Sequence, residues 1–143
     1  MAHNIRVEAS LWLLLALLLL TLPVSWIIAA VLAAVFHELC HLLVLKCCHI
    51  SVYKLRIRAG GAVLDTGSMG DREELLCTLA GPAGSFLLLG LVHITPRIAM
   101  CGLVQGLFNL LPLGDLDGGR AVRCAIRLIR GKSPCKRGKM RVQ

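Results

Sequence analysis

The sequence predicts an all-α polytopic membrane protein with about four transmembrane helices, a small cytoplasmic-side β-hairpin and a broken fourth helix. Two observations predict this class. Hydrophobic residues make up 57% of the 143-residue chain and the mean hydropathy is +0.76, whereas a soluble domain is about 45–50% apolar. Residues 9–45 and 75–114 each carry a single formal charge. Since one crossing needs about 20 apolar residues, each block is long enough for two spans.

The net charge of +8 comes from an uneven distribution of basic residues. Nine of the 16 Lys and Arg residues follow Gly119, in a segment that has no Asp or Glu. A basic tail beside a span is typical of the cytoplasmic side of a membrane. We therefore expect a membrane core at 1–120, a basic cytoplasmic tail at 121–143, both termini in the cytoplasm, and no nucleic-acid partner.

The first apolar block must contain a break. As one helix, residues 9–45 would run about 55 Å, too long for a single crossing. Pro23 is the natural break, which predicts helices over 5–22 and 24–46. The first of these helices also resembles a signal peptide, but cleavage near residues 29–33 would cut the second helix.

The polar segment that follows predicts a hairpin. Residues 52–58 alternate with period two, which is typical of a strand. Residues 59–61 are Ala-Gly-Gly and offer a turn, after which 62–64 can pair back. The alternative is an irregular loop.

Two further helices are expected in the second apolar block. The first runs over 75–94 with an interruption at 80–82 (Ala-Gly-Pro), and Pro96 ends it. The second is short and runs over 98–113. Three spans in place of four remain an alternative, and the segment from Arg120 predicts a basic amphipathic helix.

The seven cysteines are an odd number and form no CxxC pair. This pattern favours free thiols in a reducing compartment. A metal site at Cys47-Cys48-His49 is an alternative, although neighbouring residues rarely converge on one ion.

Three ionisable residues lie inside the apolar segment 31–45: His37, Glu38 and His41, in the pattern HExxH. An ionisable group within a span is costly and marks function. Two histidines four positions apart lie about 40° apart on one helix face, so both rings can reach one Zn²⁺ at about 2.0–2.1 Å. Glu38 points about 100° away from His37 and can take a proton from water. The alternative is a set of polar side chains hydrogen-bonded to each other across a helix bundle.

A catalytic zinc site needs a third protein ligand and an open position for water. The chemistry leaves five candidates: His3, His49, His93, Asp115 and Asp117. The glycine pair after Asp117 allows tight backbone turns, but chemistry alone does not choose between the two aspartates.

A second motif supplies a resemblance. Asn109-x-x-Pro112 is followed, after four residues, by Asp117-Gly118. Together with HExxH at 37–41, this resembles the site-2 protease family of intramembrane zinc metalloproteases (peptidase M50), and most of all its compact bacterial branch with a sporulation protease. The resemblance covers about residues 24–120 and implies that Asp117 is the third zinc ligand. Asn109 either bridges helices or contacts the substrate backbone.

One position departs from the family pattern. Ala80-Gly81-Pro82 resembles a further feature of the family, in which an Asn follows three residues after the proline. This sequence has Ser85 at that place. The departure affects any hydrogen bond that the Asn makes and leaves the metal ligands unchanged.

Residues and resemblance together predict an intramembrane zinc metalloendopeptidase with one Zn²⁺ per chain. His37, His41 and Asp117 would hold the ion, and Glu38 would act as the general base. The expected partners are membrane-embedded or membrane-associated protein substrates, the lipid bilayer, and a regulatory membrane protein as a further candidate. We expect a bacterial cell membrane as the location. The alternatives are an inactive membrane scaffold and a metal-binding carrier, neither of which has a use for Glu38.

The predicted ligands differ in depth. Counted from the outer face, His37 lies about 20 Å into its helix and Asp117 about 28 Å into a straight fourth helix. To bring them together, Pro112 and Gly114 must break the fourth helix and fold the chain back, or the second helix must be shifted.

Overall fold

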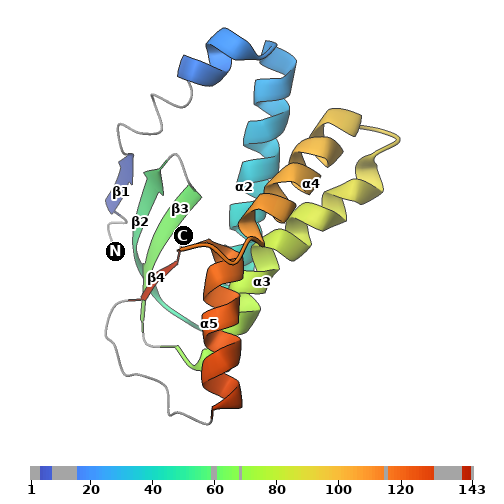
Figure 1. The fold of residues 1–143 in the computed structure, drawn as a ribbon. Coiled ribbons are helices and arrows are strands. Elements are labelled where there is room, and N and C mark those ends of the chain that lie inside the picture. The colour runs from blue at the N-terminus through green and yellow to red at the C-terminus, as the bar shows by residue number, and fades with distance from the viewer. Residues whose placement is uncertain are drawn as a thin grey trace.

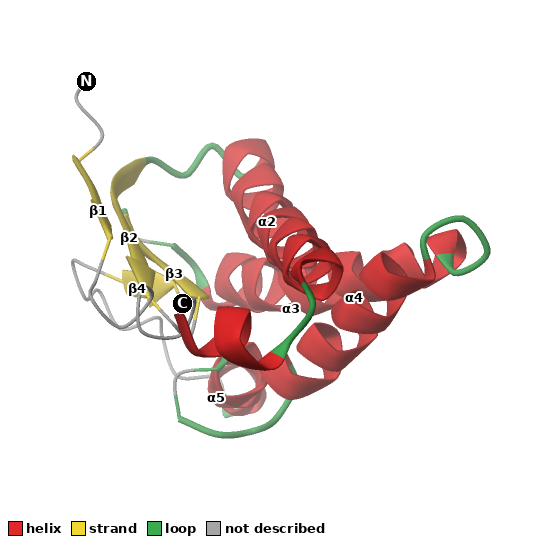
Figure 2. Cartoon of the chain, turned by 90° about the horizontal axis from the view of Figure 1, so that it is seen from above, coloured by secondary structure: helices red, strands yellow, loops and turns green. Residues whose placement is uncertain are grey.

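The computed structural model describes residues 4–7, 16–58, 61–67, 69–114, 116–130 and 140–142. A group of packed helices carries a small sheet at one side (Figures 1 and 2). The elements in chain order are β1 (Asn4–Val7), α2 (Val24–Cys47), β2 (Val52–Arg58), β3 (Gly61–Thr66), α3 (Asp71–Leu87) with its 3₁₀ extension η1 (Leu88–Leu91), α4 (Pro96–Asn109), α5 (Asp117–Ile129) and β4 (Met140–Val142).

Helix α2 is confirmed almost to the residue. It begins directly after Pro23, which breaks the chain from the helical residues 16–21. The buried residues of its second half recur every four positions, and therefore lie on one face: Ala33, His37, His41 and Leu45. The opposite face is apolar and open, with Leu39 54% and Leu43 65% exposed. That combination suits a helix with one face on protein and the other on lipid.

Two helices in the described part of the chain are long and apolar enough to cross a membrane, α2 and the continuous Asp71–Leu91 segment. Helix α4 has 14 residues, which is about 21 Å and shorter than the roughly 30 Å hydrocarbon core. The count of four spans stays a prediction.

The end of α2 explains the Cys47-Cys48-His49 segment without a metal. His49 has φ = 55°, and the backbone N–H groups of His49 and Ile50 donate to the carbonyls of Lys46 and Leu45. This pair of bonds with a left-handed residue is the Schellman motif that ends many helices. The segment therefore satisfies the last carbonyls of α2.

The sheet is larger than the predicted hairpin. Strands β2 and β3 pair antiparallel, β1 pairs parallel with β2, and β4 pairs antiparallel with β3, which gives the order β1-β2-β3-β4. The predicted helix over 5–22 is therefore wrong at its start, because residues 5–7 lie in β1. The local apolar pattern favoured a helix there. The backbone is extended instead, because it pairs with a strand about 50 residues away, with Ile5 opposite Leu55.

Helix α3 runs without interruption through Pro82, so the predicted interruption at 80–82 is wrong. A proline inside a helix removes one backbone hydrogen bond and crowds the preceding turn. Pro82 is fully buried, and α3 packs against α2, α4 and α5. Packing on three neighbours stabilises the helix against this local cost, as neighbouring helices do for prolines in membrane helices.

The chain breaks between α4 and α5, which is one of the two arrangements that the difference in depth predicted. Helix α4 ends at Asn109 and α5 begins at Asp117, with Gly114 at φ = +46° in the intervening turn. A Cβ at Gly118 would collide with the backbone of Leu110. This close approach brings the first turn of α5 against the end of α4, and Asp117 and Asn109 both lie against Nε2 of His37. Helix α5 also continues past residue 120, the predicted end of the core. The division between core and tail at this residue stays a prediction.

Candidate metal centre

Three side-chain atoms from two distant segments meet inside the helices. Nε2 of His37, Nε2 of His41 and Oδ2 of Asp117 lie 3.2 Å from one another in every pairing. The three residues are 1%, 0% and 2% exposed, respectively. The two rings approach edge to face, with centroids 4.9 Å apart. Within the described residues, this is the group whose donor atoms could hold a metal ion.

The spacing of these atoms fits zinc. A tetrahedral ion with ligands at about 2.0–2.1 Å requires ligand atoms about 3.3 Å apart, close to the 3.2 Å triangle. Two imidazoles and one carboxylate are ligands typical of catalytic zinc. Oδ1 of Asp117 is buried and has no hydrogen-bond partner among the described residues. A buried carboxylate with an unsatisfied oxygen is costly unless a cation balances it.

A glycine makes room at the centre of the group. Gly81 of α3 is buried, and a Cβ there would collide with Nε2 of both His37 and His41. The space beside the donor atoms therefore depends on the missing side chain. The Ala-Gly-Pro feature at 80–82 did not indicate this role of Gly81. The signal that could have found its role is the spacing of 77, 81 and 85, which matches the four-residue spacing of the histidines.

Helix α3 also contacts the outer nitrogen of each histidine. Nδ1–H of His41 donates to the backbone carbonyl of Cys77 (2.7 Å), and Nδ1 of His37 lies 2.8 Å from Oγ of Ser85. A ring nitrogen held in this way leaves Nε2 available as a ligand. Ser85, the position that departs from the family pattern, thus touches a predicted ligand directly.

The remaining candidates separate clearly. The amide nitrogen of Asn109 lies 3.1 Å from Nε2 of His37, so Asn109 borders the group. Glu38 follows His37 on α2 and is partly buried; its role as general base stays a prediction. His49 and His93 are exposed and outside the group. His3 and Asp115 lie outside the described residues.

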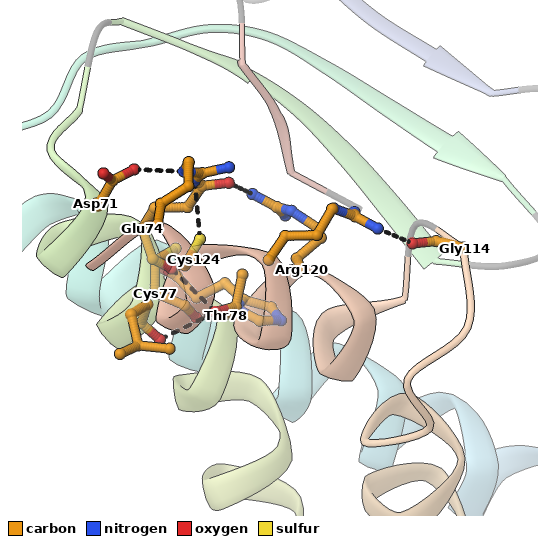
Figure 3. Close-up of polar contacts among 11 residues, drawn as sticks. Asp71, Glu74, Cys77, Thr78, Gly114, Arg120 and Cys124 are labelled. Atoms are coloured by element: carbon orange, nitrogen blue, oxygen red, sulfur yellow. Dashed lines mark hydrogen bonds and ion pairs between the residues drawn. The ribbon is translucent and has the colours of Figure 1, made fainter. Parts of the chain in front are cut away.

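An ionic cluster holds α5 on α3 (Figure 3). Arg127 donates to Asp71 (2.7 Å) and Glu74 (2.6 Å), and Arg120 donates to Glu74 (3.4 Å). Asp71, Glu74 and Arg120 are all buried. Since α5 begins with Asp117, this cluster fixes the helix that carries the third donor. The basic amphipathic helix predicted from Arg120 onward did not indicate these carboxylate partners on α3.

The electrostatics of the cluster follow from burial and pairing. Burial alone would lower the pKa of Arg127, but the hydrogen bond to Asp71 and the nearby negative charges raise it. Burial, followed by the charge of Glu74, raises the pKa of the Cys124 thiol to about 12. Cys124 therefore stays neutral as it accepts a hydrogen bond from Arg127 (3.1 Å), and the two carboxylates balance the two guanidinium groups.

The variant Glu74→Gln tests this cluster. Removal of the charge leaves Arg120 buried without its anion, which should cost about 3 kcal/mol of folding free energy and weaken zinc binding through movement of α5. Glu73→Gln is the matched control, because Glu73 accepts a hydrogen bond from the N–H of Gly70 and an amide oxygen can do the same. Chemical unfolding in detergent and zinc titration provide the measurements. Equal folding stability of the two variants would show that the ionic cluster does not stabilise the packing of α5 on α3.

Comparisons with known proteins indicate the family and the fold of the chain. The profile of peptidase family M50 matches residues 69–143, just over half of the chain. Among solved structures, the chain is similar to the site-2 protease from Methanocaldococcus jannaschii, with a TM-score of 0.72 and 24% sequence identity over 87% of this chain and 67% of that chain. No curated protein gives a significant sequence match.

Proposed function

The chain belongs to peptidase family M50, the family of the site-2 proteases, and from this membership we propose that it is an intramembrane zinc metalloendopeptidase. The observation that carries the proposal is the buried triangle of His37, His41 and Asp117, with its 3.2 Å edges. These three side chains would hold one Zn²⁺ per chain. When bound, the ion would lower the pKa of a water molecule and polarise the carbonyl of the scissile peptide bond.

The chain's own residues account for the proton transfers. Glu38 accepts a proton from the attacking water and then donates it to the leaving amine. Asn109 lies at the edge of the triangle, 3.1 Å from His37, where its amide can hydrogen-bond the backbone of an unwound substrate. Water must reach this site while lipid does not, and the non-helical backbone at 110–114 suits a water-accessible cavity, since such backbone is tolerated at depth only under protein or water.

The proposed substrates are membrane-embedded or membrane-associated proteins. Their helices must unwind before cleavage, because helical hydrogen bonds hide the carbonyl. Strand addition to the sheet would hold the unwound segment. Both β2 and β3 are paired on each side, so a substrate strand would add outside β1 or β4, or displace one of them. Four spans, a bacterial cell membrane and cytoplasmic termini belong to the same proposal, together with a regulatory membrane protein as a partner.

The test is a cleavage assay in liposomes. The purified chain is reconstituted with a panel of single-span and hairpin membrane proteins and assayed with zinc, with a chelator, and with zinc restored. We expect cleavage of at least one substrate, its loss on chelation and its return with zinc, at one zinc per chain by metal analysis. Asp117→Asn should lose both zinc and cleavage. His49→Ala should keep both, because His49 lies outside the triangle. Cleavage that continues after the metal has been removed would contradict the proposal.

A further inference from the structure

Three residues of α3 form a stripe against the two histidines of α2. Cys77, Gly81 and Ser85 are four positions apart and therefore share one face of the helix, and all three are buried. The Cys77 end contacts His41 and the Ser85 end contacts His37. Gly81 lies between them, with its open side toward both Nε2 atoms. The two ends of the stripe thus meet each imidazole at Nδ1, the nitrogen that faces away from Asp117.

The two ends of the stripe differ chemically. A backbone carbonyl only accepts hydrogen bonds, so Cys77 requires the proton of His41 on Nδ1 and leaves the lone pair on Nε2. A serine hydroxyl can accept or donate. If Ser85 donated to Nδ1 of His37, the proton of His37 would lie on Nε2 and point at Asp117. If Ser85 accepts from Nδ1–H, the lone pair of Nε2 points into the triangle.

We propose that Ser85 is a positioning residue that accepts a hydrogen bond from Nδ1–H of His37 and so presents the Nε2 lone pair to the metal. This inference rests on the proposed function, because it gives a role to a residue that contacts a zinc ligand. Three observations carry it: the 2.8 Å contact, the complete burial of Ser85, and the matching contact of Cys77 with His41 at 2.7 Å. Because the Ser85 hydroxyl is fully buried, bulk water does not compete with it for Nδ1 of His37.

The packing around Ser85 holds the hydroxyl in place. A Cβ at Gly106 of α4 would lie 3.1 Å from Cβ of Ser85, and one at Gly102 would lie 2.8 Å from its carbonyl oxygen. Helix α4 therefore packs closely on this part of α3, and larger side chains at residue 85 have little room. Replacement by alanine is the suitable test, since it removes the hydroxyl and adds no volume.

The experiment compares Ser85→Ala with Thr78→Val. Thr78 is an equally buried hydroxyl on α3, but it bonds the carbonyls of Glu74 and Leu75 of its own helix. Zinc affinity is measured by chelator competition, and the protonated nitrogen of each histidine is identified by ¹⁵N NMR of the zinc-free protein. We expect Ser85→Ala to weaken zinc binding about 10–100-fold, the usual effect of losing a partner of a ligating histidine. The His37 signals should change and the His41 signals should not, and Thr78→Val should match the parent.

The possible results distinguish failure of this inference from failure of the proposed function. Equal zinc affinity of Ser85→Ala and the parent would overturn this inference alone and leave the proposed function intact. Equal losses in Ser85→Ala and Thr78→Val would also overturn it, because they would show a general packing effect. A parent chain that binds no zinc would overturn the proposed function and this inference together.

Discussion

Glu38→Gln is expected to abolish proteolysis while the chain keeps its zinc. Glutamine has nearly the same size as glutamate, but its amide cannot take up a proton at neutral pH. General-base catalysis contributes about 10²–10⁴-fold to a rate, so we expect cleavage to fall by at least about 100-fold. His37, His41 and Asp117 are untouched by the substitution. Cleavage of a co-reconstituted membrane substrate and zinc content are the two measurements.

A matched control variant and the two alternative functions predict different results from Glu38→Gln. Glu73→Gln makes the same chemical change at the start of α3, where Glu73 caps the N–H of Gly70, and it should cleave normally. A metal carrier would be indifferent to the loss of Glu38, as would an inactive scaffold. If Glu38→Gln cuts the substrate at the parent rate, the hydrolytic interpretation fails.

Gly81→Ala is expected to remove zinc binding without any change to a ligand. The added Cβ would collide with Nε2 of His37 and of His41, so at least one ring must turn away from Asp117. We expect a loss of affinity greater than the roughly 100-fold that follows from removing a partner of a ligand. Zinc titration measures it, and circular dichroism shows whether the helices remain.

The control for this variant lies in the same helical segment. Gly90 belongs to η1, and a Cβ there meets nothing within 4 Å. Gly90→Ala should therefore bind zinc as the parent does. Parent-like zinc affinity in Gly81→Ala would contradict the close contact between Gly81 and the two Nε2 atoms, because it would mean that α3 can move away from the histidines without loss of zinc binding.

Local signals were reliable where one short segment decides the structure. Pro23 and the apolar run after it predicted α2 to within one residue. The HExxH spacing placed His37 and His41 on one face. The difference in depth predicted either a shift of the second helix or the break that the structure has before Asp117. These features depend on helix geometry and on a single proline, which act over a few residues. The roles of the site residues as ligands and base stay proposals.

Local signals failed where distant segments compete. The proline rule predicted an interruption at Pro82, but contacts of α3 with three other helices keep it continuous. An apolar pattern predicted a helix at residues 5–7, but pairing with β2 made them a strand. Neither outcome could follow from the neighbours in sequence, because each depends on chain that folds back from far away.

The amino-acid sequence by itself determined the membrane character, the histidine pair on α2 and the aspartate motif, since composition and helical periodicity are properties of short stretches. Only the tertiary structure decided which groups surround the donors: the Cys77 carbonyl, the empty side of Gly81, the Ser85 hydroxyl, and the arginine–carboxylate cluster between α3 and α5. The physical reason is that buried polar groups must find partners across helices, and the partners are chosen by how the helices pack.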